Sequence, residues 1–397
     1  MYTISDFYNT YKNGITLIAG SGGLSHPVSI AGFLDYELVP ELKSKFFNTN
    51  FIKDQLLLTS FLYAKENPHQ MLDAIKHIIS KGCSGLVIRN VFHLPISDVV
   101  IRYANSKNFP IFLIESRNIF FEDIVYQIKE HQQILNSFDR ENEIINRIIN
   151  LSLSAEELKE AAFQLNPSFR EQFFCSFCLL SDIFFLDEPY KVYERFNGSK
   201  YDNAKNSLVF GNNGIFFICS GYDISDLCTD EYISGLYALI LDDEIEKRIG
   251  IGNTHNSLFD LKSAIMESIY SSLYCGISDK SISNYDDLEA YKIIFPYAKD
   301  GLMADFSKNL LEPIKEFDTY YNYDFYKTLE TYISSGNDIH KTAKLTGLHE
   351  QSIRYRLNKI YTLTNTNAKS AASIEQLSLA VKIGKAKELL DNFWFQI

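Results

Sequence analysis

Residues 337–361 read NDIHKTAKLTGLHEQSIRYRLNKIY, and this stretch predicts two short helices joined by a tight turn. Asp338 is a suitable N-cap for a first helix over about 339–345. Gly347 follows, and glycine readily adopts the positive φ that such a turn requires. The second helix starts near Glu350, whose carboxylate favours the positive end of the helix dipole. Two helices arranged in this way are typical of a helix-turn-helix.

The second helix is predicted to be amphipathic. Ile353, Leu357 and Ile360 recur at i, i+4 and i+7, so they share one buried face. At about 100° per residue, the opposite side presents Gln351, Tyr355, Asn358 and Thr362. The apolar face of the first helix is expected to be narrow and to consist of Ile339, Ala343 and Leu345.

The polar side of the second helix suits a DNA groove, because Gln and Asn pair with adenine and Arg pairs with guanine. The residues expected to meet bases are Gln351, Ser352, Arg354 and Tyr355, with Asn358 further along the same side. Lys341, Lys344 and Lys359 are expected to contact phosphates. Arg356 lies nearer the core edge, and we expect it to pair with an acidic residue such as Asp338 or Glu330.

The competing interpretation is an ordinary solvated surface helix. The distribution of charge favours nucleic acid instead. Residues 325–397 hold 10 Lys+Arg and 6 Asp+Glu, a net charge of +4, whereas residues 1–324 hold 28 and 44, a net charge of −16. A basic segment on an acidic chain suits local phosphate binding.

The composition bounds the class of protein. A chain of 397 residues favours two or three domains. It has no apolar run of the roughly 18 residues that a membrane helix needs, and its first residues lack the pattern of a signal peptide, so we expect a cytoplasmic protein. Cys175 and Cys178 form a C-x-x-C within FFCSFCLL, which reads as a buried strand that turns them to opposite faces. We therefore expect a structural role for both cysteines and not a zinc or redox role. Paired catalytic groups are not evident in the sequence either, so we expect no metal, no cofactor and no catalytic residues.

The first 120 residues alternate short apolar runs with helical stretches, which predicts β-α-β units and a parallel sheet. Strands are expected at 54–60, 85–89 and 110–116, with helices at about 69–80 and 97–107. Ligands of such sheets collect at the carboxyl ends of the strands. The candidate residues for a small polar effector there are Thr59, Ser60, Arg89, Asn90 and Glu115. The alternative is that these side chains simply face solvent and loops.

The rest of the chain is predicted more coarsely. Residues 124–165 read as helical, and 168–299 as a mixture of strands and helices that includes a hairpin around 211–214. A strand is expected at 248–253 and a helix at 257–276. A final amphipathic helix at 373–390 is expected to pack on the helix-turn-helix, and three lysines on it (Lys382, Lys385 and Lys387) are candidates for further phosphate contacts.

With these residues in view, the chain resembles the PucR (purine catabolism regulator) family. The resemblance is most specific over Ala343–Ile360, where Arg354–Leu357 reads R-Y-R-L. The first region is similar through Gly22, Gly23, Pro27 and Val28 and through the L-L-L-T of Leu56–Thr59. RIGIGN followed by SLFDLKSAIMES resembles the GGDEF-like middle domain of such regulators, but no G-G-[DE]-E-F loop is present. The resemblance implies a ligand-responsive regulator that acts as a dimer or higher oligomer.

Together these features predict an α/β and α+β multidomain protein. Its parts would be a parallel-sheet sensor domain (1–122), linker helices (123–166), a GGDEF-like domain without the catalytic motif (167–300) and an all-α helix-turn-helix domain (301–397). The expected function is effector-dependent regulation of transcription, in which a homodimer or higher homo-oligomer binds specific sequences of double-stranded DNA. The alternatives are a nucleotide-processing enzyme and a ligand-sensing adaptor that does not bind DNA.

Overall fold

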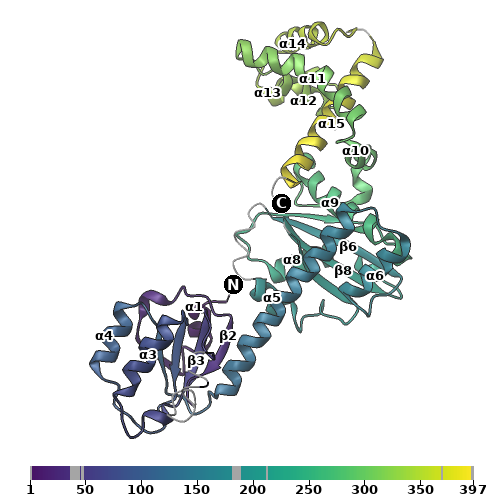
Figure 1. The fold of residues 1–397 in the computed structure, drawn as a ribbon. Helices are drawn as coiled ribbons and strands as arrows, with labels where there is room; N and C mark the ends of the chain where they lie inside the picture. The colour runs from purple at the N-terminus through teal and green to yellow at the C-terminus, as the bar shows by residue number, and fades with distance from the viewer. Residues whose placement is uncertain are drawn as a thin grey trace. The chain divides into compact units, whose positions relative to one another are not determined.

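The computed structural model of the chain describes residues 2–35, 45, 49–180, 189–211, 213–367 and 370–394. These residues form two compact units (Figure 1). The first comprises the described residues up to Arg140 together with 189–191, and the second comprises the remainder from Glu141 onward. The predicted domain boundaries divide the chain more finely, and they stay predictions.

The first unit is built on a five-stranded sheet in the order β1-β5-β4-β3-β2. Its strands are β1 (Ile15–Ala19), β2 (Ile30–Phe33), β3 (Gln55–Thr59), β4 (Gly85–Ile88) and β5 (Ile111–Ile114). The pairs among β2, β3, β4 and β5 are parallel, as predicted, whereas β1 pairs antiparallel with β5 at the sheet edge. This antiparallel edge strand was not among the strands predicted from the sequence.

Helices cover both faces of this sheet, and this explains why its strands read as continuous apolar runs. Leu57 packs in one core with the helices α3 (Gln70–Ser80) and α4 (Asp98–Ser106). Its neighbours Leu56 and Leu58 pack in the other core with α1 (Ile4–Tyr11) and the start of α5 (Phe121–Asn150). The predicted strands and helices of this region are therefore confirmed.

The helix α5 contributes to the cores of both units. Ile124 and Ile128 lie in the core of the first unit, whereas Ile145 and Ile148 lie in that of the second. After a short break, Ser154 caps α6 (Ala155–Leu165) with a capping box. The helical region predicted at 124–165 is thus two helices.

The second unit contains a sheet in the order β10-β9-β6-β8-β7. Its strands are β6 (Gln172–Leu180), β7 (Asn206–Gly211), β8 (Gly214–Gly221), β9 (Lys247–Ile251) and β10 (Ile282–Asn284). Only the β9–β10 pair is parallel. Helices α7 (Pro189–Phe196), α8 (Asp230–Ile240) and α9 (Leu261–Ser278) accompany it. The predicted β7–β8 hairpin, the β9 strand and the α9 helix are confirmed.

Two details of this sheet follow from side-chain size and direction. A Cβ added to Gly250 would lie 2.0 Å from the carbonyl oxygen of Ser268, so only glycine lets α9 approach β9 this closely. Cys175 and Cys178 are both buried on β6, and burial raises the pKa of the Cys175 thiol to about 12. The described residues contain no group of His, Cys, Asp and Glu side chains arranged to hold a metal ion.

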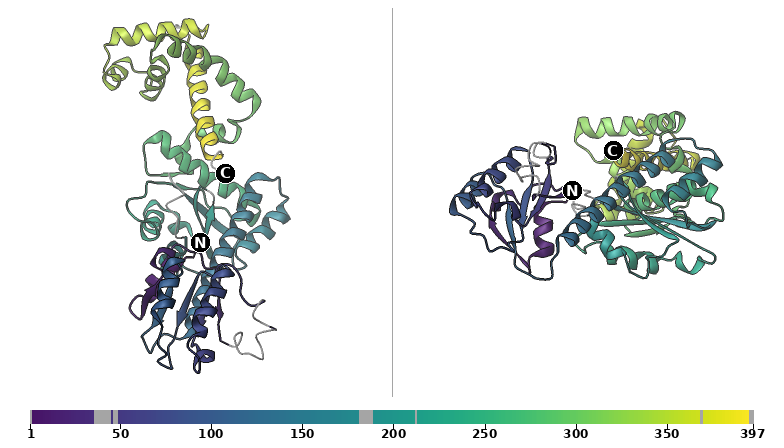
Figure 2. Two further views of the ribbon diagram at one scale, coloured as in Figure 1. Left: turned by 60° about the vertical axis from the view of Figure 1, so that its left-hand side comes forward. Right: turned by 60° about the horizontal axis from the view of Figure 1, so that its bottom comes forward.

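Among the described residues, six α-helices complete the second unit. They are α10 (Tyr291–Tyr297), α11 (Gly301–Tyr321), α12 (Phe325–Ser334), α13 (Ile339–Thr346), α14 (Glu350–Leu363) and α15 (Ala371–Trp394). The first half of α15 packs in the core of this helical part through Leu377 and Val381, while Leu390 and Phe393 near its end pack in the core of the β6 sheet. Figures 1 and 2 show α15, in yellow, running from the helices to that sheet.

The predicted fold class is confirmed at the level of two mixed α/β sheets followed by a helical domain. Among the residues that the structure describes, no helix combines the length and the apolar character needed to span a membrane.

Candidate nucleic-acid interface

The helices α13 and α14 form the predicted helix-turn-helix. The Asp338 carboxylate caps α13 by accepting a hydrogen bond from the Lys341 amide at 3.0 Å. Gly347 ends α13 with a φ of 69°, in the left-handed region. The Leu348 amide then donates to the Ala343 carbonyl at 3.1 Å, and α14 begins at Glu350. The cap, the turn glycine and the start of α14 are all as predicted.

The apolar back of α14 is buried. Ile353, Leu357 and Ile360 share a core with Phe325 and Leu329 of α12, and residues of α11, α13 and α15 complete it. Burying each of these large aliphatic side chains contributes about 2 kcal/mol. The core therefore holds α14 in one orientation, with its other side outward.

The prediction that Leu345 belongs to the apolar face of α13 is wrong. Ala343 is buried and Ile339 packs at the edge of the core, but Leu345 is 69% exposed. At about 100° per residue, Ile339 and Ala343 lie on one face, and Leu345 is turned roughly 200° away from Ala343. The apolar face of α13 is accordingly narrower than predicted.

All five side chains expected to meet bases are exposed, namely Gln351, Ser352, Arg354, Tyr355 and Asn358. Arg354 forms an ion pair with Glu350, one turn earlier, with Nη2 3.7 Å from Oε2. Glu350 also contacts His340 Nδ1 at 3.0 Å, and this hydrogen bond lowers the pKa of the Glu350 carboxyl. The front of α14 thus exposes polar side chains on a backbone that the buried core holds in place.

The lysines expected to contact phosphates differ in their surroundings. Lys341 and Lys344 on α13 are exposed. The hydrogen bond from the Lys341 amide lowers the pKa of the Asp338 carboxyl, and the Lys341 charge adds a smaller effect. Lys359 is half-buried, with Nζ 5.1 Å from the ring centroid of Phe317 on α11. This contact holds the Lys359 ammonium against α11.

Arg356 does not pair with Asp338 or Glu330, so that prediction is wrong. Its Nη1 donates to Thr328 Oγ1 at 2.8 Å and to the Asp324 carbonyl at 3.4 Å, and its guanidinium lies 5.4 Å from the Phe325 ring centroid. Arg356 therefore ties α14 to α12. The sequence carried no signal for this contact, because it depends on where α12 packs.

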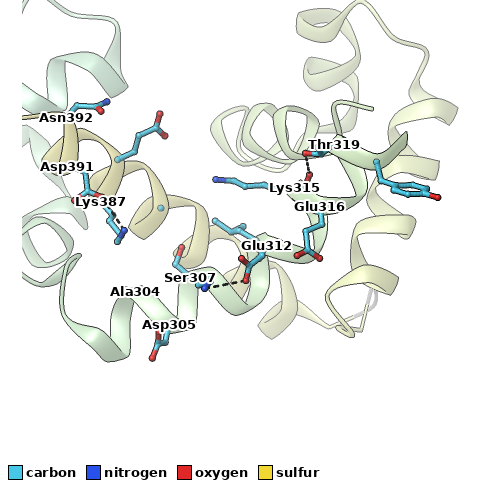
Figure 3. A pocket seen from close by; sticks show the side chains of 15 residues that line it. Ala304, Asp305, Ser307, Glu312, Lys315, Glu316, Thr319, Lys387, Asp391 and Asn392 are labelled. Atoms are coloured by element: carbon cyan, nitrogen blue, oxygen red, sulfur yellow. Dashed lines mark hydrogen bonds and ion pairs between the residues drawn. The ribbon is translucent and has the colours of Figure 1, made fainter. Parts of the chain in front are cut away.

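The lysines of α15 are largely engaged within the protein. Lys385 Nζ lies 3.7 Å from Glu330, and Lys387 Nζ lies 3.2 Å from Asp391. Lys387 and Asp391 also line a groove between α11 and α15, where Lys308 pairs with Glu312 (Figure 3). Because charges of both signs neutralise one another there, this groove is a poor phosphate site.

In the first unit, the candidate effector residues of β3 are close to Asp35. Thr59 is buried, and its hydroxyl donates to the Leu34 carbonyl at 2.6 Å and to Asp35 Oδ1 at 3.0 Å. The Ser60 hydroxyl lies 3.3 Å from the same carboxylate oxygen. Thr59 thus closes the end of its strand, while Ser60 is half-exposed beside a carboxylate.

The other three candidates follow β4 and β5. Arg89 donates to backbone carbonyls of the loop after β5, most closely to Ile119 at 2.6 Å. Asn90 makes two 2.8 Å hydrogen bonds with the backbone of Leu94, and Glu115 is exposed. An effector at this edge would meet Glu115 and Ser60 directly, whereas Arg89 and Asn90 already stabilise loops.

Comparison with known proteins identifies both ends of the chain. Residues 8–132 match the purine catabolism regulatory protein-like family, and residues 325–383 match the PucR C-terminal helix-turn-helix domain. An N-terminal and a C-terminal part of the chain are therefore similar to domains found in PucR-type proteins, and neither match covers residues 133–324. The second match spans α12, α13 and α14 and the first half of α15, so the PucR helix-turn-helix domain coincides with the core described above.

Two individual proteins show similarity to parts of this chain. The purine catabolism regulatory protein of Bacillus subtilis (strain 168) is 31% identical over 117 residues, which are 29% of this chain. The match spans only 20% of the length of that protein. A crystal structure of a regulator of polyketide synthase expression from Bifidobacterium adolescentis matches 61% of this chain and 98% of its own, at 12% identity and a TM-score of 0.26.

Proposed function

We propose that this PucR-type chain is a sequence-specific DNA-binding transcriptional regulator whose affinity for DNA depends on a small-molecule effector. The observation that carries the proposal is the two-sided helix α14. Its back, formed by Ile353, Leu357 and Ile360, is buried, while its front exposes polar side chains. A helix presented in this way fits the major groove.

The roles of the front residues follow from their chemistry. Gln351 and Asn358 can each pair bidentately with adenine, and Arg354 with guanine. Gln351 and Arg354 lie in the first turns of α14, where recognition helices meet base edges. Lys341 and Lys344 on α13 would contact phosphates, which position the protein without reading sequence.

The second unit would assemble the active oligomer. A dimer places two recognition helices about one helical turn of DNA apart, roughly 34 Å. The β9 strand followed by α9 resembles a GGDEF-like domain, but the chain has no G-G-[DE]-E-F loop. We therefore assign the middle domain an assembly role and no catalytic one.

The first unit would bind the effector at the carboxyl ends of β3, β4 and β5. Ser60 and Glu115 offer a hydroxyl and a carboxylate that a small polar molecule could engage. The effector regulates DNA binding only if it binds the two states of the protein with different affinity.

The test of DNA recognition uses the full chain. Selection from a pool of random-sequence duplexes should enrich a preferred site, and Gln351→Ala should weaken binding to that site by about 1–3 kcal/mol. Gln376→Ala is the matched control, because Gln376 is also an exposed glutamine but belongs to α15 and not to α14. Failure to enrich any sequence, or equal affinity of both variants for the site, would count against the proposal.

A second variant separates phosphate contacts from base contacts. Lys341→Ala should weaken binding to every duplex and reduce the slope of log Kobs against log salt by about 0.9. Lys308→Ala serves as its control, since Lys308 pairs with Glu312 in the groove between α11 and α15. A change in base preference alone would show that Lys341 has a different role.

The effector is tested by thermal shift, because a ligand that binds the native state raises the melting temperature. Purines, amino acids and sugar acids are screened first. A compound that stabilises the chain should lose its effect in Glu115→Gln and should change the affinity of the wild-type chain for its selected DNA site. A stabilising compound that leaves DNA affinity unchanged would argue against effector-dependent regulation.

A further inference from the structure

Four aromatic side chains form a continuous cluster where α11 meets α12. This aromatic rim consists of Phe317, Tyr321, Tyr323 and Phe325. The Phe317 ring lies 4.6 Å from Tyr321, 5.9 Å from Tyr323 and 5.3 Å from Phe325, measured between centroids. Tyr323 in turn stacks on Phe325 at 5.1 Å. Such spacing is that of mutually packed rings.

The aromatic rim lies directly beside the recognition helix. Phe325 meets the Tyr355 ring edge-on at 6.5 Å, and the Arg356 guanidinium lies over Phe325. Lys359 places its ammonium over Phe317. The rim therefore flanks α14 along the side that carries residues 355, 356 and 359.

Only part of the rim is buried. Phe325 is fully enclosed, whereas Tyr321 is 56% exposed and Tyr323 is 49% exposed. Neither tyrosine hydroxyl has a hydrogen-bond partner among the described residues. The inner rings thus brace two tyrosines whose donors are free.

The backbone of the rim is also fixed. Asn322 ends α11 with a φ of 55°, and the Tyr323 amide donates to the Asp318 carbonyl at 3.1 Å. Both carboxylate oxygens of Asp318 accept amide hydrogens of α12, from Phe325 and Tyr326, each at 2.8 Å. The Asp318 charge is therefore turned toward the protein, and the tyrosines lose little conformational freedom on binding a partner.

We propose that the hydroxyls of Tyr321 and Tyr323 donate hydrogen bonds to DNA phosphates beside the groove that receives α14. This inference rests on the proposed function and extends its contact surface beyond the helix-turn-helix. Tyrosine hydroxyls are common phosphate donors. Arg356 and Lys359 place their cations on rings of the rim, and Lys327 is exposed two residues after Phe325. The exposed carboxylates next to the rim in sequence are Glu316 and Asp324, so the cations outnumber them and the local charge suits a polyanion.

The experiment compares the full-length double variant Tyr321→Phe/Tyr323→Phe with the wild-type chain on one mixed-sequence duplex over a range of salt. These changes remove two hydroxyls and keep all four rings. We expect affinity to fall about fivefold per hydroxyl at every salt concentration. The slope of log Kobs against log salt should not change, because a neutral donor displaces no counterion. The melting temperature should also be unchanged.

Tyr320→Phe is the matched control. Tyr320 neighbours the rim and is exposed, but it lines the groove between α11 and α15 instead. Its affinity for the duplex should equal that of the wild-type chain.

Three results would overturn the inference, and they differ from one another. Wild-type affinity of the double variant refutes the phosphate contacts while leaving the proposed function intact. A shift of the monomer–dimer equilibrium with unchanged DNA affinity would assign the rim to a second copy of the chain. If the wild-type chain binds no duplex even at low salt, the proposed function itself fails and the inference fails with it.

Discussion

Two arginines of α14, Arg354 and Arg356, are expected to give opposite phenotypes when each is replaced by alanine. Arg354 is exposed and forms an ion pair with Glu350 at 3.7 Å. Arg356 is half-buried and donates to Thr328 Oγ1 at 2.8 Å. The two residues are of the same type and lie on the same helix, but only Arg356 contacts another helix. Comparing the two alanine variants therefore separates an effect on DNA recognition from an effect on folding.

The magnitudes follow from these contacts. An exposed pair one turn apart contributes about 0.3–0.5 kcal/mol, so Arg354→Ala should leave stability within about 0.5 kcal/mol of the wild type. A bidentate contact with guanine contributes about 1–3 kcal/mol of discrimination, so specific affinity should fall between fivefold and 150-fold. Arg356→Ala loses a partly buried hydrogen bond and a contact with the Phe325 ring, which together cost about 1–2 kcal/mol of stability.

The assay measures both quantities on the same preparations. Thermal unfolding followed by circular dichroism reports stability, and fluorescence anisotropy with the selected duplex and a scrambled duplex reports specific and non-specific binding. Arg354→Ala should narrow the ratio of the two affinities at an unchanged melting temperature. Arg356→Ala should lower the melting temperature and preserve that ratio. The reverse pattern would refute the assigned orientation of α14.

Three further predictions concern the folding of the second unit. Gly347→Ala should lower the free energy of unfolding of the helical domain by about 1–2 kcal/mol, because alanine is strained at the left-handed φ of 69°. The added Cβ itself would not clash, since nothing lies within 4 Å of it. Gly347→Asn should lower the free energy of unfolding less than Gly347→Ala, and thermal unfolding measures both variants. Asp318→Ala removes the acceptor of two amide hydrogens at the start of α12 and should lower the free energy of unfolding by about 1–2 kcal/mol. Asp318→Asn should have an intermediate effect, because its amide keeps one acceptor oxygen. Equal melting temperatures for the wild type and both variants would show that water replaces the cap. His255 has a raised pKa, chiefly because of its 3.1 Å hydrogen bond to Glu267, with Asp260 adding a smaller effect. The resulting stabilisation is fully present below the unfolded pKa of about 6.5 and is lost as pH rises through the higher folded pKa. His255→Gln should therefore flatten the dependence of melting temperature on pH near neutrality, and an unchanged profile would rule out this coupling.

The sequence predicted the elements whose signals are local. Alternating strands and helices marked most of the first sheet, and the i, i+4, i+7 spacing of Ile353, Leu357 and Ile360 identified the buried back of α14. The Asp338 cap and the Gly347 turn could also be predicted, because capping and positive φ depend on the residue itself and its immediate neighbours. The family matches agree with the helix-turn-helix derived in this way.

The predictions that failed concern contacts between elements distant in sequence. Arg356 was expected to find a carboxylate and instead met Thr328 and a backbone carbonyl of α12. Leu345 was expected to be buried, but Leu345 on α13 is 69% exposed among the residues that the structure describes. The antiparallel edge strand β1 was missed, because its pairing with β5 joins segments about a hundred residues apart.

The sequence by itself determined which side of α14 is apolar, where α13 is capped and which strands are buried on both faces. These properties arise from the 3.6-residue helix period, side-chain chemistry and permitted backbone angles, all of which act over a few residues. Tertiary structure alone decided that Phe317, Tyr321 and Tyr323 line up beside α14 and that one end of α15 packs in the core of the β6 sheet. Such contacts depend on how whole helices pack, and no local pattern in the sequence specifies that.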